Sequence, residues 1–96
     1  MRLLSHLLRR FIRTGHLRIT DHAGAVHSFG APGTTPAVAL RFTDRAVERE
    51  IFFNPELKTA EAYMDGRLQM QDGSAIFDLL HLFSVNRTGL IPTSNT

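Results

Sequence analysis

The chain has 96 residues, of which 43% are hydrophobic and 21% charged, a composition typical of a globular domain with room for one core. It has no cysteine, which excludes disulfides and thiolate metal sites, and no apolar run approaches the ~18 to 20 residues that cross a bilayer. The net charge of +2 conceals an asymmetry. Residues 1–20 hold five arginines and no acid, whereas the rest of the chain has six basic and nine acidic side chains. An anionic partner would therefore be steered to the N-terminal segment.

The first dozen residues predict an amphipathic helix, because their apolar side chains recur at i, i+3 and i+4 spacing. The apolar set is Leu3, Leu4, Leu7, Leu8, Phe11 and Ile12. The opposite side holds Arg2, Ser5, Arg9, Arg10 and Arg13. We expect Gly15 to end this helix in a left-handed conformation.

Three strands follow, predicted by alternating apolar residues at positions 16–21, 25–29 and 37–42. The first two flank a tight turn at Gly24 and are expected to form a hairpin. Residues 30–36 contain two glycines and two prolines and therefore predict a loop.

The second half of the chain predicts two helices, a strand and a last helix. Thr43 or Asp44 can cap the first of these helices, which should end near residue 53. Asn54 as cap and Pro55 at the first helical position predict the next, which should run to residue 64 or 65 before a glycine.

The chain ends with a short strand, a helix and a tail. Alternation over residues 67–71 predicts the strand, and an apolar stripe from Ile76 to Phe83 predicts the helix. This order of elements predicts an α+β domain at residues 1–86, with a small three- or four-stranded antiparallel sheet covered by four helices. Residues 87–96 have no periodicity and predict a tail or linker.

One segment carries a family resemblance. Residues 60–66 read Ala-Glu-Ala-Tyr-Met-Asp-Gly and follow Pro55-Glu56-Leu57. This run resembles a motif in the N-terminal region of cyclopropane-fatty-acyl-phospholipid synthases, where glycine usually replaces Ala60. The motif residues carried over are Glu61, Ala62, Tyr63, Met64, Asp65 and Gly66. Weaker matches are the basic amphipathic start, Gly15 to Ile19, Phe29-Gly30 and the ending through Asn86, so the likeness covers roughly residues 1 to 87.

The resemblance implies an accessory domain without catalysis of its own. In that family a further, Rossmann-like domain binds S-adenosylmethionine and transfers a methylene group to an acyl chain. Its glycine-rich loop is missing here, because the sequence contains no G-x-G triplet. The chain is therefore expected to be a fragment, an isolated domain or the product of a truncated reading frame, and to hold no cofactor itself. It would work with a catalytic methyltransferase domain in cis or in trans, by helping to dock the enzyme on phospholipid bilayers or by guiding the acyl chain.

A second resemblance concerns the fold. The order of elements from residue 37 to the last helix is similar to the closing half of sterol carrier protein domains, in which helices and a twisted antiparallel sheet surround an apolar tunnel. This likeness implies a sterol-carrier-like fold and a role in handling lipids.

The N-terminal helix has two interpretations. It can bind an anionic phospholipid bilayer, with Leu3 and Leu7 at the acyl boundary and the arginines on headgroups. The basic residues assigned to this contact are Arg2, Arg9, Arg10 and Arg13. Alternatively, its leucines pack on the sheet and its arginines face water, since a small domain needs those leucines for its core. Both can hold in part.

No catalytic or metal site is predicted. The histidines at positions 6, 16, 22, 27 and 81 lack metal-ligand spacing, although His22 and His27 could meet across the hairpin. Glu61 and Asp65 share a helical face, but Lys58 and Arg67 are near enough to pair with them in solvent.

The motif segment also has two interpretations: a contact with the catalytic domain or the lipid, or a structural turn in which Tyr63 packs on the sheet. Nucleic acid is not expected as a partner, because the chain has one tyrosine and no aromatic-basic strand. Two alternatives to docking stay open: a stand-alone carrier of an acyl chain, and a structural or dimerisation partner of a separate methyltransferase subunit, with a homodimer as one form. A secretory signal is not expected, since arginines interrupt the apolar stretch. The protein is expected to be cytoplasmic and peripheral at the inner face of the membrane.

Overall fold

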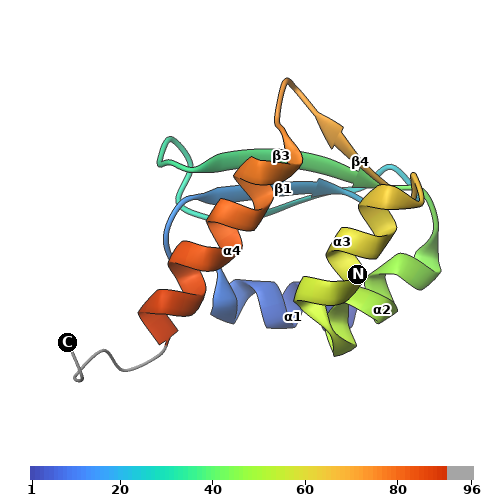
Figure 1. The fold of residues 1–96 in the computed structure, drawn as a ribbon, viewed down its shortest axis with the longest axis horizontal. Helices are drawn as coiled ribbons and strands as arrows, with labels where there is room; N and C mark the ends of the chain where they lie inside the picture. Colours follow the sequence, from blue (N-terminus) through green and yellow to red (C-terminus); the bar gives the residue numbers. More distant parts are fainter. Residues whose placement is uncertain (91–96) are drawn as a thin grey trace.

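The structure is a computed structural model that describes residues 1–90, with side chains described through residue 87. Four helices lie on one side of a four-stranded sheet (Figure 1). The elements in chain order are α1 (Arg2–Phe11), β1 (His16–Thr20), β2 (Val26–Gly30), β3 (Ala37–Phe42), α2 (Arg45–Phe53), α3 (Pro55–Met64), β4 (Leu68–Gln71) and α4 (Ile76–Leu90). The predicted α+β class is confirmed, and the finer likeness to sterol carrier proteins stays a prediction.

The sheet is mixed, so the prediction of an antiparallel sheet was wrong. Its strand order is β2-β1-β3-β4, in which β1 pairs antiparallel with β2 but parallel with β3, and β4 pairs antiparallel with β3. A parallel pair needs a long crossover, and the hairpin with its Gly/Pro-rich loop supplies one between β1 and β3. The loop delivers the chain to the far edge of β1, where the His16 N–H donates to the Pro36 carbonyl at 2.9 Å.

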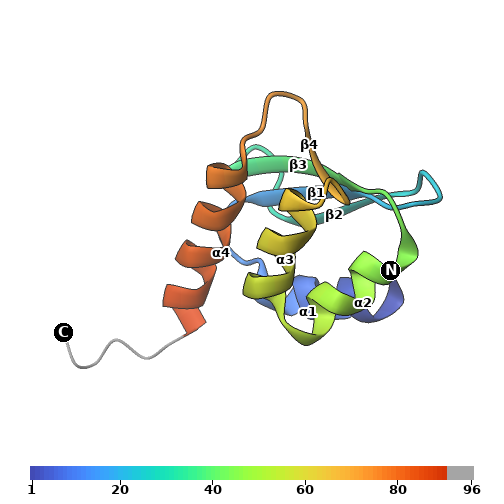
Figure 2. The same ribbon diagram turned by 45° about the vertical axis from the view of Figure 1, so that its right-hand side comes forward.

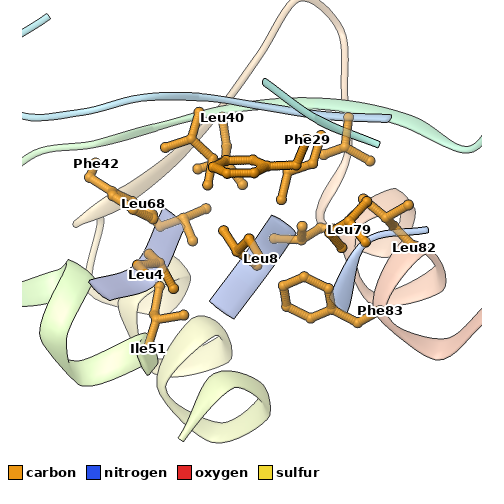
Figure 3. Close-up of a cluster of buried hydrophobic side chains, with 14 of the residues drawn as sticks. Leu4, Leu8, Phe29, Leu40, Phe42, Ile51, Leu68, Leu79, Leu82 and Phe83 are labelled. Carbon is orange, nitrogen blue, oxygen red and sulfur yellow. The ribbon is translucent and has the colours of Figure 1, made fainter. Parts of the chain in front are cut away.

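The core lies between the sheet and the helices. Alternation turns Leu17 and Ile19 of β1 inward, together with Leu40 and Phe42 of β3, and all four are buried. Figure 3 shows that Leu40 and Phe42 of the sheet point toward labelled side chains of α1, α2 and α4. Arg18 of β1 and Arg41 of β3 alternate with the buried residues on the outer face of the sheet. The outer face of the sheet is therefore polar at these positions.

The end of α1 differs from the prediction. The helix ends at Phe11, and Ile12 is its C-cap in an extended conformation. Gly15 is left-handed as predicted, with φ of 84°, but it lies beyond the cap and does not end the helix. It permits close packing instead, because a Cβ there would lie 2.5 Å from the Pro36 carbonyl oxygen and 2.6 Å from a methyl of Leu82.

Asn86 of α4 connects this last helix to residues Arg13 and Thr14, which follow α1. Its side chain is buried, and its Oδ1 accepts hydrogen bonds from the backbone N–H groups of Arg13 (2.6 Å) and Thr14 (2.8 Å). Its Nδ2 donates to the carbonyls of Thr14 (2.9 Å) and Leu82 (2.8 Å). One amide therefore fixes the position in which the chain leaves α1. The helix that carries it continues to Leu90, four residues past the expected end, and the rest of the predicted tail, residues 91–96, lies outside the described residues.

The helix caps follow the prediction in part. Asp44, and not Thr43, caps α2, because its carboxylate accepts from the Val47 N–H at 3.1 Å. Pro55 occupies the first turn of α3 as expected, but the side chain of Asn54 makes no capping hydrogen bond.

Candidate functional site

The first helix separates its two kinds of side chain by burial. Leu4 and Leu8 are almost completely buried beneath the sheet, and burial of each such leucine contributes about 1.5–3 kcal/mol. The arginines of this segment are exposed, and none has an ion-pair partner among the described residues. They are Arg2, Arg9, Arg10 and Arg13. The structure therefore agrees with the second interpretation, in which the leucines build the core and the guanidinium groups face water. Binding of these guanidinium groups to a bilayer stays a prediction.

The two leucines assigned to lipid contact differ. Leu3 is 57% exposed, so it is free to contact a partner. Leu7 is half-buried and packs against the core, because it lies on the same side of the helix as Leu4 and Leu8. Of these two leucines, only Leu3 adds a largely exposed apolar side chain to the exposed arginines of this helix.

A second exposed apolar group lies at the junction of α2 and α3. Phe53, the last residue of α2, is 74% exposed, and Leu57 in the first turns of α3 is 51% exposed. Figures 1 and 2 place this junction and α1 on the side of the helical layer away from the sheet. Sequence reasoning missed both residues. The signal was the Phe52-Phe53 pair before the Asn-Pro helix break, but only the structure shows that Phe52 packs on the core while Phe53 stays outside.

We use the name docking face for these exposed residues of α1, of the segment after it and of the α2–α3 junction. Its members are Arg2, Leu3, Arg9, Arg10, Arg13, Phe53 and Leu57. The face combines guanidinium groups with a few large apolar side chains, which is the surface chemistry of proteins that bind in the headgroup region of an anionic membrane.

The motif segment forms the end of α3 and the turn into β4. Asp65 is the C-cap and Gly66 follows with φ of 75°. The Gly66 N–H donates to the Tyr63 carbonyl at 3.1 Å, and the Arg67 N–H donates to the Ala62 carbonyl at 2.9 Å. This pair of bonds is a Schellman motif, which explains why a glycine stands at this position.

The side chains of the motif point in opposite directions. Ala62 is buried in the core, whereas Tyr63 is 41% and Met64 75% exposed. The structural turn is confirmed. Ala62 takes the inward position, and Tyr63, for which packing on the sheet was one interpretation, is only partly covered. Glu61 pairs with Lys58 at 3.0 Å as expected, but Asp65 is not the partner of Arg67.

Arg67 instead bridges two carboxylates of α2 and its cap. Its Nε and Nη2 donate to the two oxygens of Asp44 (3.0 and 3.2 Å), and its two Nη atoms donate to Glu50 (3.2 and 3.0 Å). These hydrogen bonds hold the pKa of both carboxyls below their ordinary values and raise the pKa of Arg67. The turn at Gly66 aims Arg67 toward α2, so the motif also ties α3 and β4 to α2.

The hairpin histidines contact different carboxylates and do not meet each other. His27 Nε2 lies 2.9 Å from an Asp21 oxygen, and His22 Nδ1 lies 3.4 Å from a Glu48 oxygen. The hydrogen bond from His27 is the main cause that lowers the pKa of Asp21. Among residues 1–87, no three His, Cys, Asp or Glu side chains are grouped closely enough to hold a metal ion.

An apolar cavity lies in the core, between the sheet and helices α1, α3 and α4. Its volume is about 10 Å³, and its lining includes Leu8, Leu40, Leu79 and Thr59. The hydroxyl of Thr59 is buried and has no hydrogen-bond partner among the residues that the structure describes. A cavity of this size has room for about one water molecule and is far smaller than an acyl chain.

No protein-family model, curated protein or solved structure matches this chain. The part of the chain that the structure describes contains no helix with the length and apolar character needed to cross a bilayer.

Proposed function

We propose that this chain is a non-catalytic accessory domain that docks on anionic phospholipid bilayers through the docking face. The observation that carries the proposal is the arrangement of α1, whose leucines are committed to the core while its arginines are exposed and unpaired among the described residues. Each basic residue held near an anionic membrane surface contributes ~1 kcal/mol to binding. A face with four arginines is therefore sufficient for reversible, salt-sensitive attachment.

The mode of attachment is peripheral. Because Leu4 and Leu8 are already buried against the sheet, α1 cannot turn them into the acyl region without loss of the core. Leu3, Phe53 and Leu57 are the exposed apolar side chains of the docking face that remain to enter the headgroup boundary. On this basis the domain lies on the surface of the cytoplasmic leaflet, which carries the negative charge that attracts it.

The enzyme that such a domain would serve is suggested by the motif at residues 60–66. Its resemblance to the cyclopropane-fatty-acyl-phospholipid synthases supports a catalytic methyltransferase domain, in cis or in trans, as the partner that binds S-adenosylmethionine. The chain itself would deliver that partner to the phospholipid. Glu61 is paired with Lys58, and Asp65 is an exposed cap, so neither carboxylate sits in the buried pocket that acid–base chemistry uses.

The test is binding to vesicles of equimolar phosphatidylglycerol and phosphatidylcholine, measured by sedimentation over a range of salt concentrations. Arg9→Ala/Arg10→Ala should bind about 30-fold more weakly, at about 5-fold per residue. Arg18→Ala/Arg41→Ala removes the same number of positive charges from the outer face of the sheet, where Arg18 is paired with Asp72, and should bind almost as the unaltered protein does. Equal weakening by both pairs would show that only net charge matters and would overturn the docking face.

A second candidate function is packing against the catalytic domain, and the exposure of Tyr63 and Met64 favours it. Exposed aromatic and thioether side chains, such as those at this helix end, are enriched at protein–protein interfaces. Co-purification with a methyltransferase domain encoded in frame or nearby tests this function. Tyr63→Ser/Met64→Ser should abolish co-purification, and Phe77→Ser, which alters an equally exposed residue of α4, should not. Retention of the complex by the motif variant would refute this role.

A further inference from the structure

A groove lies where the start of α1 meets α2. It has a volume of about 550 Å³ and is lined by the first residues of the chain and by residues of α2 between Arg45 and Glu50. Its basic members are Arg2, Arg45 and Arg49, and all three are exposed without an ion-pair partner among the described residues. Arg45 and Arg49 are one helical turn apart and so share a face of α2.

The acidic members of the groove already have partners. Glu48 is buried, and its two oxygens contact the α-amino group of Met1 at 2.7 Å and His22 at 3.4 Å. Glu50 is held by the two Nη atoms of Arg67. The carboxylates are therefore occupied, and three guanidinium groups remain to receive an anion.

From these contacts we infer that the groove binds the phosphate group of an anionic phospholipid presented by the bilayer. Guanidinium groups offer planar pairs of N–H donors that match phosphate oxygens, and several arginines together can neutralise the charge of a phosphate group. The bilayer is favoured as the source because Arg2 belongs to both the groove and the docking face, and the exposed Leu3 beside it can meet the acyl boundary. This inference rests on the proposed docking function and adds a specific headgroup site to it.

The groove extends a continuous basic surface. Arg2 and Arg9 are spaced i and i+7 on the exposed side of α1, so the basic stripe they form ends at the groove. A bilayer that contacts this stripe is therefore brought to the groove as well. Diffuse attraction along the stripe and forked contacts in the groove are separable, because lysine preserves the first and not the second.

The experiment measures dissociation constants for the same equimolar phosphatidylglycerol and phosphatidylcholine vesicles with the full chain. Arg45→Ala/Arg49→Ala should weaken binding by more than about 30-fold, because the charge alone accounts for about 5-fold per residue and the forked contacts are lost as well. The control Arg18→Ala/Arg41→Ala should have a much smaller effect. Arg45→Lys/Arg49→Lys keeps both charges and should still bind several-fold more weakly than the unaltered protein.

Three outcomes would overturn the groove site. The first is that the alanine pair in the groove binds as the control pair does, and the second is that the lysine pair binds as tightly as the unaltered protein. The third is tight binding of soluble glycerol phosphate, detected by NMR shifts of the arginine Nε–H groups, without binding to vesicles. That result would assign the groove to a soluble phosphate ester.

The docking function and the groove site can fail separately. If Arg9→Ala/Arg10→Ala still weakens vesicle binding while the groove variants do not, the docking function survives and the groove site fails. If the unaltered protein does not bind vesicles at all, the docking function itself fails.

Discussion

Replacement of Asn86 by alanine should destabilise the domain by about 2–4 kcal/mol. The variant loses four hydrogen bonds, each worth about 0.5–1.5 kcal/mol, and leaves the N–H groups of Arg13 and Thr14 and the Thr14 carbonyl without their partner. The expected loss of stability is smaller than the full sum of the four hydrogen bonds, because these backbone groups are partly exposed and water can replace the lost partner. On the scale of about 4–8 °C per kcal/mol for a domain of this size, Tm should fall by roughly 8–30 °C.

The assay is urea denaturation followed by circular dichroism, with hydrogen exchange of the Arg13 and Thr14 amides as a local readout. Asn54→Ala is the matched control, because Asn54 is exposed and its side chain makes no capping hydrogen bond. Its free energy of unfolding should change by no more than about 0.5 kcal/mol. If Asn86→Ala were no less stable than Asn54→Ala, the hydrogen bonds of the Asn86 side chain would not be what holds α4 to the segment after α1.

Three further predictions concern stability. The carboxyls of Asp44 and Glu50, which Arg67 binds, have pKa values below their ordinary 3.8 and 4.5. Their contribution to stability is therefore complete above these ordinary values and is lost as the pH falls through the lowered ones. The difference in the free energy of unfolding between the unaltered protein and Arg67→Met should shrink in acid, as measured by urea denaturation at a series of pH values. Gly15→Ala should be destabilising by more than Gly24→Ala, because both positions have positive φ but only Gly15 has atoms where a Cβ would stand; similar denaturation midpoints would contradict this. Thr59→Val should stabilise the protein by about 1 kcal/mol, because it replaces an unpartnered buried hydroxyl by a methyl of similar size, and a lower midpoint would show that the hydroxyl has a partner.

The order and type of the elements could be predicted from the sequence, because each has a local signal. Apolar residues recur at the helical period in α1, β1 and β3 alternate, and the Asn54-Pro55 pair separates two helices. The parallel pairing of β1 with β3 could not be predicted, because no local pattern states which edge of β1 the third strand joins. Likewise, nothing near Gly15 in the sequence shows that Pro36 and Leu82 crowd it.

The candidate site was predictable in the same uneven way. The exposed arginines of α1 follow from periodicity, but the number of leucines taken by the core does not, so Leu7 was assigned to the lipid although it packs inside. The groove and the α2–α3 junction each combine residues from two elements. Their existence depends on how α2 sits against its neighbours, which is a tertiary property.

The bridge made by Arg67 has a consequence for the groove that lies beyond stability. Glu50 lines the groove, and its hydrogen bonds to Arg67 are the main interaction that engages its charge elsewhere among the described residues. Loss of Arg67 would release an internal competitor for the groove arginines, and vesicle binding should then weaken although Arg67 is not itself part of the lining. Neutralising that competitor as well, in Arg67→Met/Glu50→Gln, should restore the affinity, and failure to do so would separate the bridge from the groove. The turn at Gly66 would in this way determine whether Glu50 pairs with Arg67 or competes with an anion for the arginines of the groove.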